Sequence, residues 1–365
     1  MTIPEALDPG EPVSLHDESG SFIASGYFNS YGQISVRLWG YEEKEPVDES
    51  FFTRRILNAW ETRRRFVERP DTNAYRLVNG ENDFLPGLIV DKYADYLVVQ
   101  FHTRGIESWK KLIIDSLEKV LRPKGIFERS DMAARRIETL GPVTGTLFGD
   151  IPDLIEIREN GFRFLVDVRE GQKTGFFLDQ RDKRLAFMKY AKNRVVHNCF
   201  AYTGGFSVYA MGGGAHRVVS IDSSERALEL AQENLVINGF NLSHCEFVCD
   251  DVKKYLKNPA LRFDAVILDP PAFIKDRRKT HEGLSGYRAI NEMALRILEP
   301  GGILLTCSCS AHLSLSNFRF LISEAGAKAR KALTFLEVFT HGIDHPQLVP
   351  FTEGEYLKCF FIKAQ

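Results

Sequence analysis

The sequence lacks the patterns that mark several protein classes. Its six cysteines form no paired C-x-x-C framework, which argues against structural zinc and suits a reducing compartment. Its nine histidines show no metal-ligand spacing, so we predict no metal site. No segment approaches the roughly 20 apolar residues of a membrane span, and the first five residues have neither the charge nor the apolar run of a signal peptide. These absences predict a cytoplasmic protein with no membrane partner.

Excess charge of either sign is also missing. Hydrophobic residues make up 44% of the chain and charged residues 26%, with a formal net charge of −2. These values are typical of globular proteins, so any RNA contact must come from a local basic face. At 365 residues the chain is long enough for two or three domains. The sequence leaves open whether it acts as a monomer or a homodimer.

The C-terminal half of the sequence alternates strand patterns with helical patterns. Apolar, β-branched runs occupy residues 194–200, 217–221, 245–249, 263–268 and 302–305, as expected of parallel strands buried on both faces. Alternating strands and helices predict an α/β fold with a doubly wound, mostly parallel, Rossmann-like sheet. Ligands of such sheets bind just beyond the carboxyl ends of the strands. The residues that follow each run are therefore the candidate site residues.

The first of these runs turns into a helix through a pair of glycines, Gly204 and Gly205. Glycines at this turn let the backbone approach a ligand closely. The second run ends about 20 residues later in Asp222, a usual position for a carboxylate that binds a ribose diol. That carboxylate fits either a nicotinamide dinucleotide or S-adenosylmethionine. Because the turn lacks the G-x-G-x-x-G spacing of dinucleotide sites, we favour S-adenosylmethionine.

Two further strand ends carry reactive side chains. Asp269, a rigid proline pair and the aromatic ring of Phe273 follow residues 263–268, and Cys309 follows residues 302–305. The carboxyl ends of parallel strands meet at one edge of a sheet, so these groups should converge on one crevice. This combination suits chemistry on a flat heterocycle.

Taken in order, these motifs resemble a known family. Residues 173–181, 198–206, 269–273 and 308–310 are similar to the bacterial class I methyltransferases that make 5-methylcytosine in 23S ribosomal RNA. The similarity extends forward through residues 76–91, 128–131 and 141–145 and reaches residues 354–358, so it covers nearly the whole chain. The resemblance implies an S-adenosylmethionine-dependent ribosomal RNA methyltransferase. Its expected partner is 23S ribosomal RNA, free or in a partly assembled large subunit.

The resemblance also implies the domain organisation. We predict a partial PUA-like RNA-binding module at residues 1–45, a linker helix at 46–70, a connecting α+β domain at 71–166 and the methyltransferase domain at 167–365. The family opens with a complete PUA module, whereas this chain is expected to begin partway into one. The linker helix should bury Phe51, Phe52, Ile56, Leu57, Trp60 and Phe66. Its arginines 63, 64 and 65 form either an exposed helix face or a surface that contacts phosphate.

Cys309 is the predicted catalytic nucleophile. Carbon 5 of cytosine is a weak nucleophile, and a thiolate that adds to carbon 6 makes it reactive enough to accept a methyl group. The alternative is that Cys309 is a small buried hydrophobe. Asp269 is predicted to hydrogen-bond or protonate the N3/N4 edge of the base, and its alternative is a cap of the following turn. Cys307 lies two residues nearer the core and is predicted to pack.

The remaining site residues are predicted from their motifs. The expected cofactor-binding residues are Gln180, Arg181, Phe200, Tyr202, Thr203, Gly204, Gly205, Asp222, Asp250, Asp251 and Asp269. Either Asp250 or Asp251 should face the adenine, with Asp251 slightly favoured, while Gln180 and Arg181 could instead form a local salt bridge and cap. The expected substrate-binding residues are Pro270, Pro271, Phe273, Lys275, Arg277 and Arg278. Phe273 could stack on a flipped nucleotide or pack, and the basic run could be a solvated loop.

Two other functions fit part of the sequence. The Asp-Pro-Pro-aromatic string also resembles motifs of enzymes that methylate an exocyclic or ring nitrogen of a purine, and such enzymes need no thiol. The chain could also be a non-catalytic RNA assembly factor that binds S-adenosylmethionine. Cys309 argues against the first alternative, and the complete set of predicted site residues argues against the second.

Overall fold

The computed structural model describes residues 7–31, 34–43, 45–258, 262–274 and 276–365, apart from the side chain of Arg277. Two compact units share these residues. Unit 1 comprises residues up to 159, 166–178 and 343–351, and unit 2 comprises residues 160–165, 179–342 and 352–365. None of the helices in the described ranges is long and apolar enough to cross a membrane.

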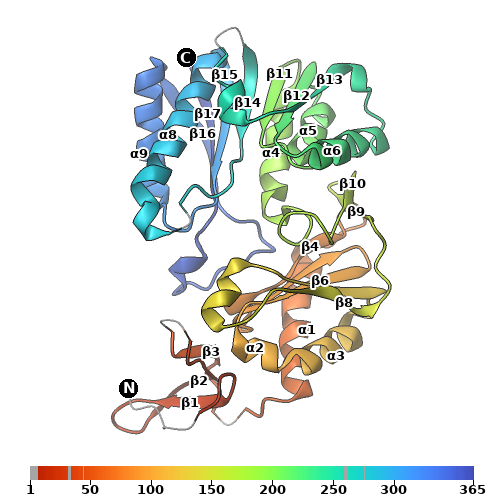
Figure 1. Cartoon of the computed structure of the whole chain (residues 1–365), viewed down its shortest axis with the longest axis vertical. Coiled ribbons are helices and arrows are strands. Elements are labelled where there is room, and N and C mark those ends of the chain that lie inside the picture. The colour runs from red at the N-terminus through yellow and green to blue at the C-terminus, as the bar shows by residue number, and fades with distance from the viewer. Residues whose placement is uncertain (1–6, 32–33, 44, 259–261, 275) are drawn as a thin grey trace. The chain divides into compact units, whose positions relative to one another are not determined.

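Unit 2 is built on a seven-stranded sheet in the order β13-β12-β11-β14-β15-β17-β16 (Figure 1). Its strands are β11 (Val195–Cys199), β12 (Arg217–Asp222), β13 (Cys245–Cys249), β14 (Phe263–Leu268), β15 (Leu298–Ser308), β16 (Leu333–Phe339) and β17 (Lys358–Ala364). The pairs among β11 to β15 are parallel, whereas β17 is antiparallel to both of its neighbours. The prediction of a doubly wound, mostly parallel sheet is confirmed.

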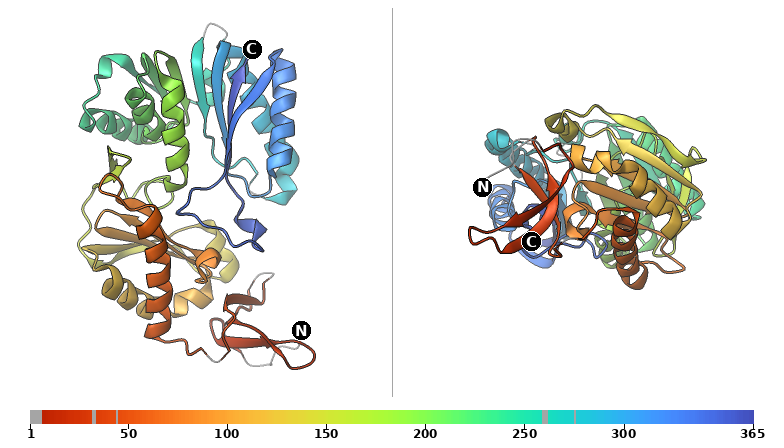
Figure 2. Two further views of the ribbon diagram at one scale, coloured as in Figure 1. Left: turned by 180° about the vertical axis from the view of Figure 1, so that it is seen from behind. Right: turned by 90° about the horizontal axis from the view of Figure 1, so that it is seen from below.

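Helices cover both faces of this sheet, as the views from the front (Figure 1) and from behind (Figure 2) make clear. The helices are α4 (Arg181–Ala191), α5 (Gly205–Gly212), α6 (Glu225–Ile237), α7 (Val252–Tyr255), α8 (Thr280–Ile297) and α9 (Leu315–Ala329). Successive residues of a strand point to opposite faces. In β14, Ala265 and Ile267 therefore pack with residues of α4 and α5, while Val266 and Leu268 pack with residues of α8 and α9. Burial on both faces explains why these strands read as continuous apolar runs.

Unit 1 contains a five-stranded sheet in the order β4-β5-β6-β7-β8 and a three-stranded antiparallel sheet, β1-β2-β3. Its strands are β1 (Pro12–His16), β2 (Phe22–Phe28), β3 (Val36–Gly40), β4 (Ala74–Asn79), β5 (Leu88–Tyr93), β6 (Tyr96–Phe101), β7 (Gly125–Ser130) and β8 (Val143–Gly149). Its helices are α1 (Glu49–Phe66), α2 (Arg104–Ser108) and α3 (Lys110–Leu121). The chain passes between the units at β9 (Ile155–Glu159) and β10 (Phe162–Val166), which follow each other closely in sequence.

The predicted apolar side of α1 is partly wrong. Phe51, Phe52 and Ile56 are buried in the core of unit 1, as expected. Leu57 is 37% exposed and Phe66 is 53% exposed, because both lie outside the face that packs on the core. Arg63 of the same helix, in contrast, is buried and only 1% exposed.

Residues 343–351 return to unit 1 late in the chain and are held there by hydrogen bonds. The backbone N–H of Arg76 donates to an Asp344 carboxylate oxygen at 3.1 Å, and Arg63 donates to the Asp344 carbonyl at 3.1 Å. The amide of Asn79 donates to the carbonyl of Pro346 at 3.1 Å. This segment therefore completes unit 1 from a position more than 260 residues away in sequence.

Candidate active site

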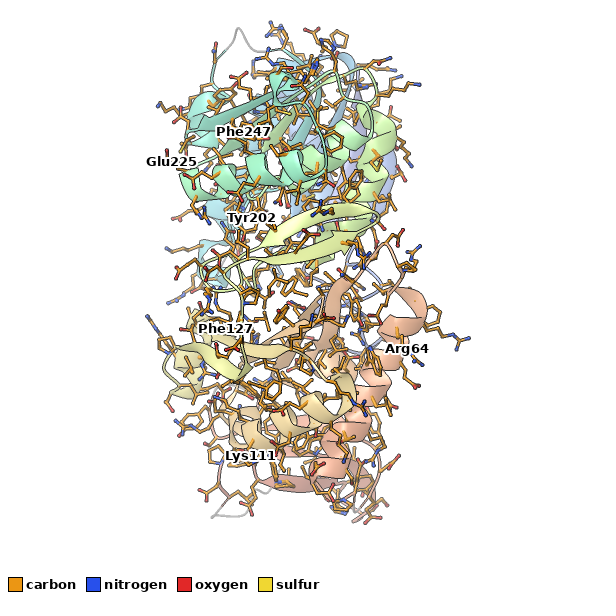
Figure 3. All side chains as sticks on the ribbon, turned by 90° about the vertical axis from the view of Figure 1, so that its right-hand side faces the viewer. Arg64, Lys111, Phe127, Tyr202, Glu225 and Phe247 are labelled. Atoms are coloured by element: carbon orange, nitrogen blue, oxygen red, sulfur yellow. The ribbon has the colours of Figure 1, made fainter. Side chains whose placement is uncertain are left out.

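The turn between β11 and α5 has an unusual backbone. Phe200, Tyr202 and Gly204 have φ values of 61°, 47° and 76°. Positive φ is uncommon for residues other than glycine and clusters at ligand-binding sites. Tyr202 is labelled in Figure 3, together with Glu225 at the start of α6 and Phe247 on β13. The paired glycines, which were predicted to let the backbone approach a ligand closely, thus lie in a turn with several positive φ values.

Asp222, the last residue of β12, holds this turn. One carboxylate oxygen of Asp222 accepts from the backbone N–H of Tyr202 at 2.9 Å, and the other accepts from that of Ser224 at 3.0 Å. Asp222 is only 9% exposed. The carboxylate predicted to bind a ribose therefore also joins the two loops that follow β11 and β12.

Thr203 contributes a polar group suited to a bound molecule. Its side chain is 3% exposed, and its Oγ1 has no hydrogen-bond partner among the described residues. Its carbonyl accepts from the side-chain amide of Asn234 at 2.9 Å, which fixes the backbone of the turn. A buried hydroxyl without a partner is costly unless a ligand or water satisfies it.

Gly204 is required at its position for two reasons. Its φ of 76° favours glycine, and a Cβ there would lie 2.8 Å from Ala231 Cβ on α6. At Gly205 the first obstacle would be the Cδ of Arg184 at 3.1 Å, part of a flexible side chain. The close approach between the turn and α6 therefore depends mainly on Gly204.

The two carboxylates after β13 have different partners. Asp251 is exposed and caps α7 by accepting from the backbone N–H of Lys254 at 2.8 Å. Asp250 accepts from the backbone N–H of Asp251 at 2.8 Å and from the Lys254 ammonium at 3.2 Å. These bonds, that from the Asp251 N–H first, lower the pKa of Asp250 below its ordinary value. The backbone N–H of Asp250 also donates to the carbonyl of Asp222, so this strand end adjoins that of β12.

Asp269 follows β14 and is held by Gln180. The Gln180 amide donates to Asp269 Oδ1 at 2.9 Å, and Gln180 Oε1 accepts from the Cys359 thiol at 3.7 Å. Gln180 is 2% exposed, and Arg181, which begins α4, is 4% exposed. The motif that contains Gln180 was predicted to line the cofactor pocket, and in the structure it orients Asp269.

Cys309 lies directly after β15, as predicted, and adjoins the Asp269 loop. Its Sγ lies 3.8 Å from the carbonyl oxygen of Pro270. Ser310 Oγ accepts from the backbone N–H of Ile274 at 3.2 Å and lies 2.9 Å from the hydroxyl oxygen of Tyr287 on α8. These contacts join the loop that carries the thiol to the loop that carries the carboxylate. The fold thus brings the reactive pair predicted from the sequence to one place.

Cys307 lies within β15 and has the packing environment predicted for it. It is fully buried, opposite Cys359 of β17, and burial raises the pKa of its thiol well above the ordinary value. Cys309, in contrast, is half-buried. Only one of the two thiols therefore lies beyond the strand end.

The predicted substrate loop is only partly described. Pro270 is buried and Pro271 is exposed. The ring of Phe273 packs on Tyr287 with centroids 4.7 Å apart, which favours the packing alternative. Arg278 is exposed and forms an ion pair with Asp276. Hydrogen bonds from the side chain and the backbone of Arg278 lower the pKa of Asp276 to about 2. Lys275 and the Arg277 side chain lie outside the described residues.

No group of three or more His, Cys, Asp or Glu side chains in the described ranges is arranged to hold a metal ion. The site is therefore characterised by its strand-end carboxylates, its strained turn and its thiol. A family model described as S-adenosylmethionine-dependent methyltransferase matches residues 142–360. The chain belongs to this methyltransferase family. S-adenosylmethionine is its cofactor, and the buried Thr203 hydroxyl and the Gly204 turn fit such a group.

Relatives of this methyltransferase match over nearly its whole length. It is 40% identical over 357 residues to the Ribosomal RNA large subunit methyltransferase I of Salmonella arizonae, covering 97% of this chain and 89% of the relative. The Escherichia coli protein of the same name is 40% identical over 358 residues, covering 96% and 90%. A solved structure of SMU.776 in complex with SAH, described as a methyltransferase, has a TM-score of 0.86 at 25% identity, covering 99% and 93%. A PUA-like domain model matches residues 1–40.

The sequence reasoning gave Lys358 no role. This lysine begins β17 and is 3% exposed, with its Nζ donating to the carbonyls of Ser310 at 2.8 Å and Tyr356 at 3.1 Å. The sequence carries one signal for a buried lysine. Lys358 stands directly before the apolar run 359–362, in a pattern typical of a buried strand, where lysine is rare.

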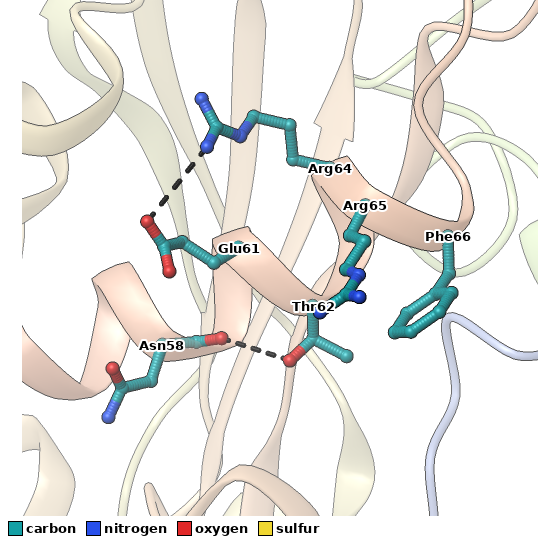
Figure 4. A pocket seen from close by; sticks show the side chains of 6 residues that line it. All are labelled: Asn58, Glu61, Thr62, Arg64, Arg65 and Phe66. Atoms are coloured by element: carbon teal, nitrogen blue, oxygen red, sulfur yellow. Dashed lines mark hydrogen bonds and ion pairs between the residues drawn. The ribbon is translucent and has the colours of Figure 1, made fainter.

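The arginines of α1 divide into two groups. Arg63 is 1% exposed and forms a bidentate ion pair with Asp83, at 2.6 and 2.7 Å, so it fits neither of the predicted alternatives, the exposed helix face or the phosphate contact. Arg64 is exposed and projects from the helix (Figure 3), with its guanidinium over the Trp60 ring and a 3.9 Å ion pair to Glu61. Arg65 lies over the Phe66 ring. Arg64 and Arg65 line a cavity of about 560 Å³ together with Asn58, Glu61, Thr62 and Phe66, and Figure 4 shows these six side chains.

Proposed function

We propose that this chain methylates carbon 5 of a cytosine in large-subunit ribosomal RNA through a covalent adduct with Cys309. The name of its 40%-identical relatives supports the substrate class. The observation that carries the chemistry is the position of Cys309, half-buried at the end of β15 with Sγ 3.8 Å from the Pro270 carbonyl oxygen. An enzyme that methylates a purine nitrogen would need no thiol there.

S-adenosylmethionine supplies an electron-poor methyl group when it is bound. The Tyr202–Gly205 turn and Asp222, which are joined by a hydrogen bond, would hold the cofactor, and the Asp222 carboxylate would accept hydrogen bonds from the ribose hydroxyls. The Thr203 hydroxyl would gain the partner that it lacks among the described residues. Asp250 or Asp251 binds the adenine, and Arg181 and Phe200 line the pocket.

Cys309 and Asp269 act on the base. The Cys309 thiolate forms a bond to carbon 6, and the electron pair of the carbon 5–carbon 6 bond becomes available for carbon 5 to take up the methyl group. Asp269, oriented by Gln180, hydrogen-bonds or protonates the N3/N4 edge and stabilises the charge that develops there. Loss of the carbon 5 proton to water then restores the double bond and releases the thiol.

RNA carrying 5-fluorocytosine at the target tests this mechanism, because fluorine cannot leave carbon 5 as a proton. Wild-type protein and Cys307→Ala should each form an adduct that survives denaturing electrophoresis, whereas Cys309→Ala should form none and still bind S-adenosylmethionine. Cys307→Ala is a matched control, because it removes a thiol two residues away, within the strand that Cys309 follows. An adduct that persists in Cys309→Ala would refute the role of this residue. Full activity in that variant would indicate transfer to an exocyclic amine.

The exposed arginines of α1 are proposed to bind RNA phosphate. Arg64 and Arg65 are both exposed, and their guanidinium groups stack on Trp60 and Phe66. Arginine is a strong phosphate ligand, and the exposed ring of Phe66 suits stacking with single-stranded bases. In a chain of net charge −2, such local basic groups are the expected source of RNA affinity.

A further inference from the structure

Lys358 is a buried cation next to the reactive cysteine. It begins β17 and pairs with Ser308, the residue before Cys309, across the antiparallel β15–β17 ladder. Its side chain is 3% exposed. A buried ammonium has lost its hydration and persists only where fixed acceptors replace the water.

Those acceptors are neutral carbonyls. Lys358 Nζ donates to Ser310 O at 2.8 Å and to Tyr356 O at 3.1 Å, which fixes the ammonium beside the residue that follows Cys309. No ion pair within the described ranges joins Lys358 to a carboxylate. An ammonium has three N–H donors, and the two carbonyls account for two of them. The positive charge is therefore held in place without being neutralised.

Three titratable groups act on this ammonium. Burial lowers the pKa of Lys358 to about 8, and Cys309, Glu355 and Cys359 each act to raise it. Glu355 is exposed, so water screens its charge. Cys359 is fully buried and donates to Gln180. Cys309 alone is half-buried at a strand end, and as a thiolate it would supply the negative charge that Lys358 lacks.

The same lysine reaches a cavity. Lys358 and Glu355 line a space of about 490 Å³ together with Ala311 and His312, which follow Cys309 closely in sequence. The ammonium thus lies between the thiol loop and a space open to solvent, so protons can exchange there.

We propose that Lys358 is a positioning residue whose ammonium, fixed on the Ser310 and Tyr356 carbonyls, stabilises the thiolate of Cys309. The thiol proton leaves to water, and the sulfur keeps the electron pair that later forms the bond to carbon 6. The ammonium compensates the charge on sulfur until that bond forms and again when it breaks. This inference rests on the proposed function, in which Cys309 is the nucleophile.

The first test measures the titration of the Cys309 thiol directly. Wild-type protein, Lys358→Met and Lys358→Arg are alkylated with iodoacetamide across a range of pH, and the Cys309 peptide is quantified by mass spectrometry. In Lys358→Met the midpoint should rise by about one pH unit or more, a tenfold loss of thiolate at neutral pH. Lys358→Arg should keep the wild-type midpoint. The exposed Cys249 is the internal control and should titrate alike in all three proteins.

The second test uses the pH profile of methyl transfer. Wild-type activity should rise with pH as the Cys309 thiol loses its proton, and in Lys358→Met this rise should move to higher pH by about one unit. Lys358→Arg should keep the wild-type profile, because a guanidinium supplies the same positive charge. Loss of a lysine that served only packing would not produce this shift. An unchanged Cys309 midpoint in Lys358→Met, or an unchanged pH profile of methyl transfer in that variant, overturns the inference.

These outcomes are separable from failure of the proposed function. If Cys309→Ala still forms the 5-fluorocytosine adduct, the nucleophile is another residue and the inference fails with it. If Cys309→Ala abolishes the adduct while the Cys309 midpoint is unchanged in Lys358→Met, the proposed function stands and only the role of Lys358 is wrong.

Discussion

Replacing Gly204 with alanine should destabilise unit 2 through two separable effects. The first is backbone strain, since φ is 76° and a left-handed conformation costs a residue with a Cβ about 1–2 kcal/mol. The second is overlap, since the new Cβ would lie 2.8 Å from Ala231 Cβ and 3.1 Å from Ala231 Cα. Overpacking of this kind typically costs about 1–3 kcal/mol. The expected loss in the free energy of unfolding is therefore about 2–5 kcal/mol.

Gly239 offers a matched control. Its φ is also 76°, but a Cβ there would meet nothing within 4 Å. Gly239→Ala should therefore carry only the backbone cost of about 1–2 kcal/mol. Urea unfolding followed by circular dichroism measures both variants, and the difference between them reports the overlap with α6. Equal losses in the two proteins would refute the close packing of the turn on Ala231.

The same substitution should weaken cofactor binding, because the turn must move away from α6 to accept the new Cβ. Calorimetry with S-adenosylmethionine should give a lower affinity for Gly204→Ala and an unchanged one for Gly239→Ala. Adding Ala231→Gly to Gly204→Ala should restore part of the affinity, although a helix-interior glycine costs about 1 kcal/mol in stability. If the double variant binds no better than the single one, overlap with Ala231 is not the cause.

Three further outcomes are expected. Asp222→Ala should weaken S-adenosylmethionine binding by about 1–3 kcal/mol, the usual cost of a hydrogen bond lost from a charged group, and unchanged calorimetric affinity would exclude Asp222 from the site. Arg63→Ala should lower the free energy of unfolding, measured by urea titration, by about 3–5 kcal/mol, because it leaves Asp83 without its buried partner. Arg64→Ala, at an exposed position, should change that free energy by less than about 0.5 kcal/mol. Charge reversal at Arg64 and Arg65 should weaken RNA binding and flatten its salt dependence, whereas Lys111→Glu on α3 should do neither, and equal effects would place the RNA surface elsewhere.

The sequence predicted the sheet and its strand-end residues because both depend on local signals. Continuous β-branched runs identify strands buried on both faces, and the residue after each run lies at the ligand-binding edge. This reasoning correctly put Asp222 at the end of β12 and Asp269 and Cys309 directly after β14 and β15. The roles proposed for these residues stay predictions.

The errors and omissions concern partners that are distant in sequence. Arg63 is buried because Asp83 and Asp344 converge on it, and Asp344 is 281 residues away. The pattern of α1 likewise gave no means of telling that Leu57 and Phe66 lie outside its packed face. Lys358 lies beside Ser310 only because β17 pairs with β15, and that antiparallel pairing departs from the alternation of strands and helices seen earlier in the chain.

The position of β17 between β15 and β16 determines when the sheet can be completed during synthesis of the chain. A ribosome releases the chain from its N-terminus, so β16 emerges before the strand that joins it to the rest of the sheet. The folding of unit 1 is also incomplete at that stage, because residues 343–351 supply its contacts with Arg76 and Asn79. Both units can therefore reach their final packing only when the last tenth of these 365 residues has left the exit tunnel, and until then the nascent chain carries exposed strand edges that a chaperone could cover.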